Sequence, residues 1–219
     1  MTENTKLLYA NSNKPRSQEE QDQIIERAAK AYEKYLDALG FDWMSDPNST
    51  NTPRRVAKAF VKDLASGCYN DPPEITAFPN HDHYTGMVFQ GGIPVKSLCS
   101  HHHMPFIGVA HVAYIPAEDG TVIGLSKLNR LVEFYSRRPQ IQESLTMQIH
   151  DSINTTCERN LGVAVVISAT HTCACLRGIK HDGCEMKTSK LSGDFFNDIS
   201  TRQEFYHFIE NMRKHQRLL

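Results

Sequence analysis

The longest predicted strand of the chain lies in the stretch GVAVVISATHTCAC, within residues 161–175. Valine, isoleucine and threonine recur through it, and these β-branched residues favour a pleated, largely buried strand. The stretch ends in side chains that bind metals or transfer protons: His171, Cys173 and Cys175. His171 and Cys173 are two residues apart, so a continuous strand would turn both side chains to the same face. The end of this strand is therefore the first candidate site.

The segments around this strand follow an α+β pattern. From residue 85 onward, the spacing of apolar residues predicts strand, strand, helix, helix, strand and strand, and a last helix closes the chain. The expected ranges are strands 85–98, 106–116, 161–175 and 184–190, and helices 126–137, Pro139 through Ile153, and 201–214. This order gives a largely antiparallel sheet with two helices on one face, and Pro94 marks a bulge or an edge strand. The open edges of such a sheet favour pairing with other subunits.

Two helices and a connector are expected ahead of this sheet. Ser17 and Glu20 have the spacing of a capping box, and an apolar stripe follows them to a stop at Gly40. Thr52 opens a second helix that is expected to run to about Gly67. We therefore divide the chain into a flexible arm (1–16), a helical region with a connector (17–84) and a main α+β domain (85–219).

Composition and charge narrow the class of protein. The chain has 219 residues, 40% of them hydrophobic, which suits either one large domain or one domain with a helical extension. Its net charge is −1, with 24 basic and 25 acidic residues and no basic run, so neither nucleic acid nor a membrane is an expected partner. The N-terminal segment lacks the apolar core of a signal peptide. The expected location is the cytoplasm, where six cysteines favour metal binding or free thiols over disulfides.

A second cluster of metal-binding side chains follows the first predicted strand. It reads Cys99-Ser-His-His-His103, and the Cys-x-x-His spacing of Cys99 and His102 lets a thiolate and an imidazole reach one ion. Zinc favours these two ligand types, and a catalytic zinc site has three protein ligands and a water. With Cys99, His102 and Cys173 as ligands, the fourth position could hold water, and the remaining histidines could transfer protons.

Other interpretations of these residues remain open. The histidine triplet could be a solvated turn, and Cys173 and Cys175 could both belong to a closed structural site with four protein ligands. The remaining cysteines at 68, 157 and 184 fit the class of small buried apolar residues. Spacing alone does not show which strand end meets which.

At these residues the chain resembles the GTP cyclohydrolase I family, which carries a Cys-x-His-His motif and, further along, His-x-Cys-x-x-x-Arg-Gly. The resemblance covers roughly residues 18–210, and the motifs occur in the family's order. The matching segments are Thr52-Pro-Arg-Arg55-Val-Ala-Lys, Cys99-Ser-His101-His102, Ile123-Gly-Leu-Ser-Lys-Leu-Asn-Arg130, Arg138-Pro-Gln-Ile-Gln-Glu143, His171-Thr-Cys173-Ala-Cys-Leu-Arg177-Gly178 and Ser200-Thr-Arg-Gln-Glu-Phe205.

The resemblance implies a fold, an assembly and a reaction. The fold is the T-fold, or tunnelling fold, with an N-terminal helical extension. The assembly is a ring of subunits, commonly a homodecamer of two stacked pentamers with active sites at subunit interfaces. The reaction converts GTP and water to 7,8-dihydroneopterin triphosphate and formate, and it is the first step of folate, biopterin or deazaguanine biosynthesis.

The resemblance also implies a role for each candidate residue. Cys99, His102 and Cys173 would bind Zn²⁺, which activates water for attack on C8 of guanine. His171 would be the acid at N7, and His101 would assist in positioning and proton transfer. The residues implied in substrate binding are Glu143 for guanine N1 and its amine, Ser126, Lys127, Arg130 and Arg177 for the triphosphate, and Arg55 from a neighbouring subunit. Ser126 would also assist the later rearrangement of the ribose.

Three positions depart from the family pattern. The family has Glu where Ser100 stands, an apolar residue at position 103, and often Met or Lys at position 175. His103 and Cys175 could compete for zinc, so the surroundings of the metal are where this chain differs. Two rival functions also remain. One is another T-fold enzyme, acting on pterins or deazapurines, which would lack a zinc cysteine or the triphosphate residues; the other is a non-catalytic, zinc-stabilised ring that binds nucleotides.

Overall fold

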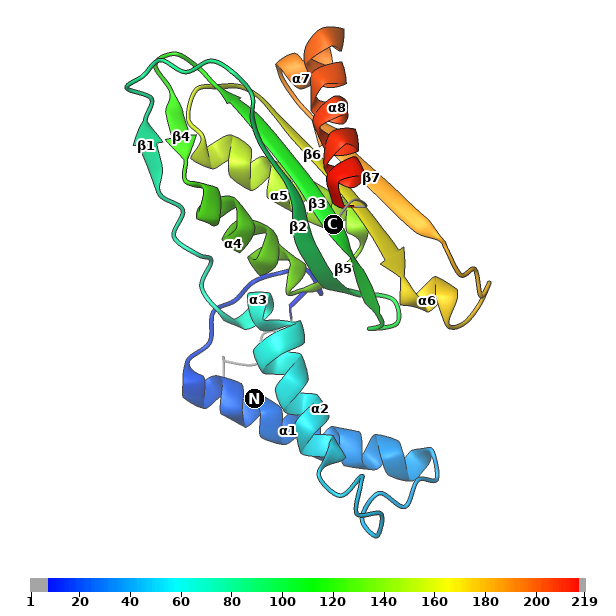
Figure 1. Ribbon diagram of the computed structural model, residues 1–219. Coiled ribbons are helices and arrows are strands. Elements are labelled where there is room, and N and C mark those ends of the chain that lie inside the picture. The colour runs from blue at the N-terminus through cyan, green and yellow to red at the C-terminus, as the bar shows by residue number, and fades with distance from the viewer. Residues whose placement is uncertain (1–7, 217–219) are drawn as a thin grey trace. The chain divides into compact units, whose positions relative to one another are not determined.

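The structure is a computed structural model that describes residues 8–216, and it divides at Asp71 into two compact units (Figure 1). The predicted boundary between helical region and main domain lies later, at residue 84. The segment between the two positions belongs to the second unit, because Ala77–Pro79 (β1) pairs antiparallel with Thr121–Ile123 (β4). The expected flexible arm falls partly on residues 1–7, outside the described residues. Its end is bonded within the first unit, since the Lys14 amide donates to the Cys68 carbonyl at 2.8 Å.

The first unit is helical, as the sequence predicts. Helix α1 (Gln18–Ala38) begins with the expected capping box, in which the Ser17 side chain accepts from the Glu20 amide and the Glu20 side chain accepts from the Ser17 amide. The second predicted helix is interrupted: it consists of α2 (Thr52–Ala59), the π-helical turn η2 (Phe60–Leu64) and α3 (Ser66–Tyr69). A small apolar core holds the unit together and contains Ile25, Ala29, Ala57 and Val61.

The second unit is built on a five-stranded sheet with the order β5-β2-β3-β6-β7. Its strands are β2 (Val88–Cys99), β3 (Pro105–Pro116), β5 (Pro139–Gln140), β6 (Asn160–His171) and β7 (Glu185–Leu191). All neighbours are antiparallel except β2 and β5, which are parallel. The predicted α+β class and largely antiparallel sheet are confirmed.

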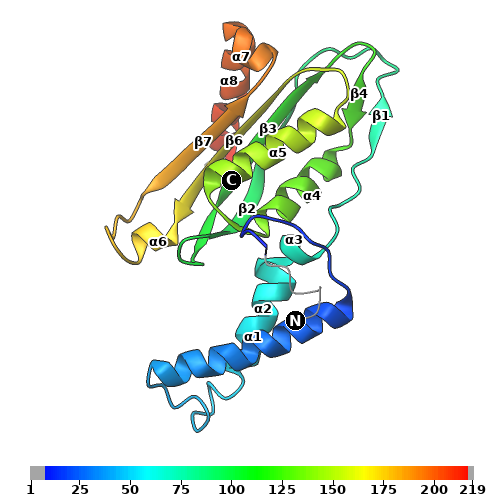
Figure 2. The same cartoon turned by 180° about the vertical axis from the view of Figure 1, so that it is seen from behind.

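Both faces of the sheet are covered, which explains the almost unbroken apolar run in β6. Helices α4 (Leu125–Ser136) and α5 (Gln142–Thr156) pack on one face, as predicted (Figures 1 and 2). Helices α7 (Asp194–Asn197) and α8 (Ile199–Gln216) pack on the other face. Alternate residues of β6 therefore enter two cores, Val165 on the α4/α5 side and Val166 on the α8 side.

One local prediction in this unit was wrong. Pro139 does not open a helix: Pro139 and Gln140 form β5 beside Leu98 and Cys99, and α5 begins only at Gln142. Of the two alternatives for Pro94, the edge strand is confirmed, because β5 pairs only with Leu98 and Cys99 and, among the described residues, leaves that side of β2 open at Pro94. The bulge lies a little earlier, since the register shift between β2 and β3 lies between Gln90 and Ile93. Gly92 there has a φ of 71°, a conformation that glycine adopts without steric cost. Within the described part of the chain, no helix has the length and apolarity needed to cross a membrane.

Candidate metal centre and active site

The candidate site forms where β2 ends, β3 begins and β6 ends. The chain turns tightly after β2: the Cys99 amide donates to the Met104 carbonyl and the His103 amide donates to the Cys99 carbonyl, both at 2.8 Å. Phe106, near the start of β3, is paired in register with His171, the last residue of β6. The two motifs that are far apart in sequence therefore meet at one end of the sheet.

The route by which Cys173 reaches this place differs from the prediction. The strand ends at His171, and residues Thr172–Cys175 form one helical turn, α6. The argument that a continuous strand points His171 and Cys173 to the same face was therefore wrong. Thr172 fixes the turn by donating from its hydroxyl to the Pro105 carbonyl at 2.6 Å.

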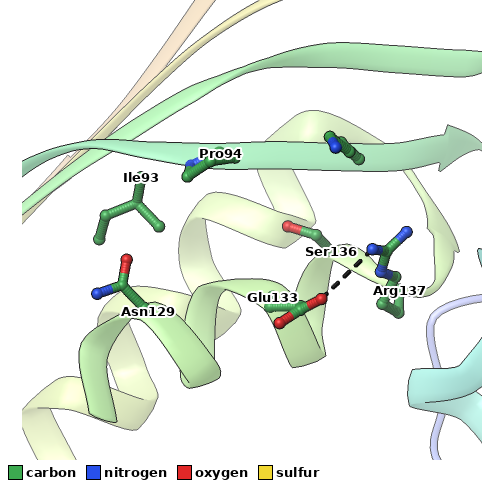
Figure 3. A pocket seen from close by; sticks show the side chains of 7 residues that line it. Ile93, Pro94, Asn129, Glu133, Ser136 and Arg137 are labelled. Carbon is green, nitrogen blue, oxygen red and sulfur yellow. Dashed lines mark hydrogen bonds and ion pairs between the residues drawn. The ribbon is translucent and has the colours of Figure 1, made fainter. Parts of the chain in front are cut away.

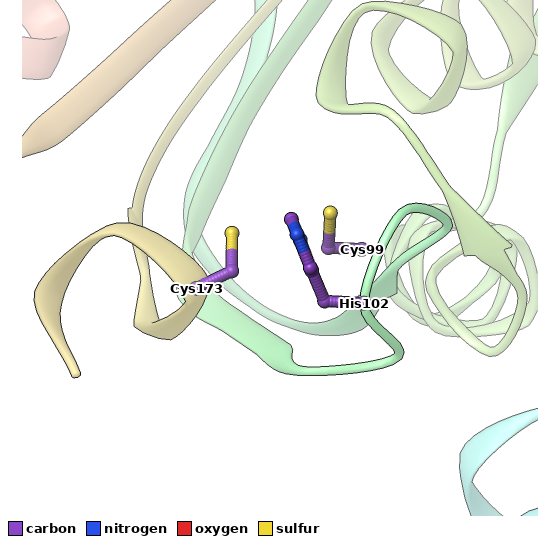
Figure 4. Close-up of side chains that lie close together, drawn as sticks. All are labelled: Cys99, His102 and Cys173. Carbon is purple, nitrogen blue, oxygen red and sulfur yellow. The ribbon is translucent and has the colours of Figure 1, made fainter. Parts of the chain in front are cut away.

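Cys99, His102 and Cys173 form a compact set of possible metal ligands (Figure 4). Their ligand atoms all lie within 4.8 Å of one another. Ligand atoms around a tetrahedral zinc ion are about 3.5–3.8 Å apart, as follows from zinc–sulfur and zinc–nitrogen bonds of about 2.3 and 2.0 Å. Two thiols and an imidazole at this spacing fit zinc after small side-chain movements. Among the described residues, neither His103 nor Cys175 belongs to this set, which favours a site with three protein ligands over a closed one.

The pKa of the Cys173 thiol also favours a bound cation at this site. Burial raises the pKa of the Cys173 thiol, and the neighbouring Cys99 raises it further. The guanidinium of Arg177 acts in the opposite direction. Two adjacent thiolates repel each other, and a bound divalent cation removes this repulsion because it stabilises both charges.

Two further predicted residues lie against these ligands. The Arg177 guanidinium donates from Nη1 to His102 Nε2 at 2.8 Å. The Nδ1 atom of His101 lies 3.6 Å from Cys99 Sγ. The ligand set therefore has beside it a cation that could bind an anionic substrate and an imidazole that could transfer a proton.

His171 is held beside the cluster by two contacts. Its ring stacks on Phe106 with 4.6 Å between the ring centroids, and its Nε2 lies 2.9 Å from Oε1 of Gln142. Burial lowers the pKa of His171, and the carboxylate of Glu143, the residue after Gln142 in α5, acts in the opposite direction. Gln142 was not predicted as a site residue. Its position beside Glu143 in a matched motif was the available signal.

The substrate-binding candidates on α4 are not brought to the cluster within one chain. Ser126 and Lys127 open α4 as predicted, and Lys127 donates to the Glu74 carbonyl at 3.2 Å. The other end of α4 faces the cluster, since β5 follows it and pairs with Leu98 and Cys99. A helical rise of about 1.5 Å per residue separates Lys127 from that end by about 14 Å. Arg130 lies on the same helix, and Arg55 lies on α2 of the first unit.

A cavity of about 280 Å³ lies between β2 and α4 (Figure 3). Its lining contains Ile93, Pro94, Lys96, Asn129, Glu133, Ser136 and Arg137. Arg137 forms an ion pair with Glu133 at 3.3 Å, so the positive charge of Arg137 in this cavity is already compensated. None of the predicted site residues lines this cavity.

Comparison with known proteins agrees with the geometry. The family model described as GTP cyclohydrolase I matches residues 27–210. GTP cyclohydrolase 1 of Flavobacterium johnsoniae is 44% identical over 190 residues, which cover 85% of this chain and 82% of that protein. The enzyme of the same name from Caldanaerobacter subterraneus is 40% identical over 191 residues, 86% of this chain and 98% of that protein. The matched span includes both halves of the cysteine and histidine cluster, and this chain belongs to the GTP cyclohydrolase I family.

Proposed function

We propose that this chain, a hydrolase of the GTP cyclohydrolase I type, opens GTP with one zinc ion held by Cys99, His102 and Cys173. The products are 7,8-dihydroneopterin triphosphate and formate. The observation that carries the proposal is the convergence of these three side chains, from two distant segments, within 4.8 Å. Bound zinc supplies an activated water at neutral pH, provided that one of its positions is not taken by the protein.

The protein's own groups then handle the protons. C8 of guanine becomes more electrophilic when N7 is protonated, and His171 is the proposed donor to N7. The stacking on Phe106 and the bond to Gln142 fix its ring, so its proton is delivered in one direction. His101, beside Cys99, is the second proposed proton carrier.

Guanine is recognised by a carboxylate in this proposal. Glu143 lies in the first turn of α5, next to the buried Gln142, and its side chain is exposed. One carboxylate can accept from both guanine N1–H and the exocyclic amine, because these two donors are side by side. Its position near His171 suits a base whose N7 must meet that imidazole.

The triphosphate requires more cations than one chain assembles. Arg177 is the candidate within the cluster, whereas Ser126 and Lys127 are at the far end of α4 and Arg130 lies in the middle of that helix. We therefore propose that a second copy supplies α4, and that Arg55 also comes from a neighbouring subunit. Ser126 would assist the later ribose rearrangement.

The sheet edges support such an assembly. In the described residues β7 forms one edge, and at the other edge β5 covers only Leu98 and Cys99 of β2. Unpaired strand edges favour pairing with another chain. The proposed form is a T-fold homodecamer of two pentamers with active sites at the interfaces. It acts in the cytoplasm, at the entry to folate, biopterin or deazaguanine biosynthesis.

Formate release from GTP tests the proposed function. Zinc-loaded protein is expected to release one formate per GTP and to yield a pterin that fluoresces after oxidation and dephosphorylation. A Cys99→Ser variant should lose both products, whereas Cys184→Ser, a cysteine outside the cluster, should keep them. Absence of formate from the zinc-loaded wild type would refute the proposal.

A further inference from the structure

Gln142 is a buried polar side chain next to the candidate site, and both ends of its amide are bonded. It is the first residue of α5 and has no exposed surface. Its NH₂ group has two hydrogens, which are shared among three acceptors: the Ile167 carbonyl at 3.2 Å, the Met186 carbonyl at 3.1 Å and Thr188 Oγ1 at 3.1 Å. Its Oε1 lies 2.9 Å from His171 Nε2. A buried amide with this many partners has a defined orientation.

The partners decide which end of the amide faces His171. The carbonyl oxygens of Ile167 and Met186 only accept hydrogen bonds, so the group that faces them must be the NH₂. With the amide turned over, two carbonyl oxygens would face a third oxygen without a hydrogen between them. The oxygen of Gln142 therefore faces His171, and it can only accept.

The two threonines hold the amide in this orientation. Thr146 donates its hydroxyl hydrogen to the Gln142 main-chain carbonyl at 2.9 Å. The Thr188 hydroxyl, 2.6 Å from Thr146 Oγ1, must then donate to Thr146, which leaves its oxygen to accept from Gln142. Each hydroxyl donates once in this closed circuit, so no member can reverse without breaking a buried bond.

The circuit fixes a proton on one nitrogen of His171. Since Gln142 Oε1 accepts, His171 Nε2 must carry the hydrogen. The neutral imidazole then has its lone pair on Nδ1, which is the nitrogen that can exchange a proton during the reaction. Phe106 stacks on the ring with an interplanar angle of 10° and restricts its rotation.

We infer that Gln142 is a positioning residue that fixes the Nε2-protonated tautomer of His171 and so assigns proton transfer to Nδ1. The inference rests on the proposed role of His171 in the reaction. It adds a residue outside the ligand and substrate sets, and it acts through His171 without touching the substrate. To act as the acid at N7, His171 takes up a second proton at Nδ1 and gives that proton to N7, while the Nε2 hydrogen stays bonded to Gln142.

Nuclear magnetic resonance of the zinc-loaded protein with ¹⁵N-labelled histidine tests the tautomer directly. The His171 signals are assigned by their absence in His171→Asn, and spectra are taken near pH 8.5, about two units above the usual imidazole pKa. The expected result is a neutral His171 with hydrogen on Nε2. A neutral His171 with hydrogen on Nδ1 would overturn the inference, and this spectrum needs no Gln142 variant.

Gln142→Met removes the acceptor at nearly constant volume. We expect mixed tautomers and a kcat for formate release lowered at least about tenfold, with KM changed less than about twofold, since ground-state contacts to GTP are kept. Gln148→Met is the matched control, because Gln148 lies on the same helix and bonds to Arg138, Gln140 and Ser144 instead of His171. Unchanged kcat in a folded Gln142→Met protein would overturn the inference.

If Gln142→Met does not fold, the spectrum of the wild-type protein still decides the inference, because it needs no substitution at Gln142. The test is separate from that of the proposed function. If the wild type releases no formate, the function fails, while the tautomer is still decided by the spectrum.

Discussion

Replacing the two cysteines of α6 one at a time separates a three-ligand zinc site from a four-ligand one. Cys173 belongs to the set of ligand atoms within 4.8 Å, whereas Cys175, two residues later in the same helical turn, does not. Serine keeps the size of each side chain and removes the thiolate. The two variants make the same chemical change, so any difference in zinc affinity between them comes from the position of the cysteine relative to the metal.

The expected magnitude follows from the strength of zinc sites. Four-ligand structural sites bind zinc with roughly 10–16 kcal/mol, so one ligand contributes about 3 kcal/mol, or about a hundredfold in affinity. Cys173→Ser should weaken zinc binding by at least this factor. Cys175→Ser should change it less than about twofold, because no bond to the metal is lost.

Competition with a chromophoric chelator measures both affinities in the same buffer. Circular dichroism of each apo-protein checks that the fold is retained. A loss of zinc in Cys175→Ser as large as that in Cys173→Ser would refute the three-ligand site and support a closed structural centre. Equal affinities of Cys173→Ser and the wild type would remove Cys173 from the ligand set.

Three further predictions concern assembly, pH and packing. The first mixes subunits of the inactive Cys99→Ser and Lys127→Ala proteins during reassembly. Activity should recover to roughly a quarter of the wild-type value, because one site in four then has both an intact cluster and an intact α4. No recovery would contradict active sites that are shared between copies. Burial raises the pKa of the Cys157 thiol from 9.0 to about 11. The unfolded thiol therefore ionises first, and the free energy of unfolding should fall as the pH rises from 9 to 11. Urea midpoints measured across this range should fall less in Cys157→Ala than in the wild type. A methyl group on Gly108 would meet a β6 carbonyl oxygen at 2.0 Å, so Gly108→Ala should destabilise the fold by about 3 kcal/mol or more. Gly178 has open space around it but a φ of 65°, so Gly178→Ala should cost only about 1 kcal/mol. Thermal unfolding of the two variants measures both losses.

Local patterns predicted most of the elements because each has its own periodicity. The alternating and continuous apolar runs gave the four long strands, and the stripes of α4 and α5 gave the two helices on one face. The predicted strand that corresponds to β6 ran too far, to residue 175. The partner strand β3 begins at Pro105, opposite the end of β6, so residues after His171 have no ladder to join and turn into α6.

The features that were missed depend on contacts between distant segments. β5 is a strand only because Pro139 and Gln140 lie beside Leu98 and Cys99. Gln142 is a polar residue at the start of a helix, where exposure is expected, and it is buried because it bonds to β6 and β7. The ligand set was predicted from motifs, but the separation of Lys127 from it could be seen only once α4 was placed on the sheet.

A crystal structure of the zinc-loaded protein tests the central claim most directly, because it shows what occupies the fourth position of the metal. The account predicts zinc bound by Sγ of Cys99, a nitrogen of His102 and Sγ of Cys173, with a water as the fourth ligand. Zinc bound by a fourth protein side chain, such as Cys175 or His103, without a water would contradict it.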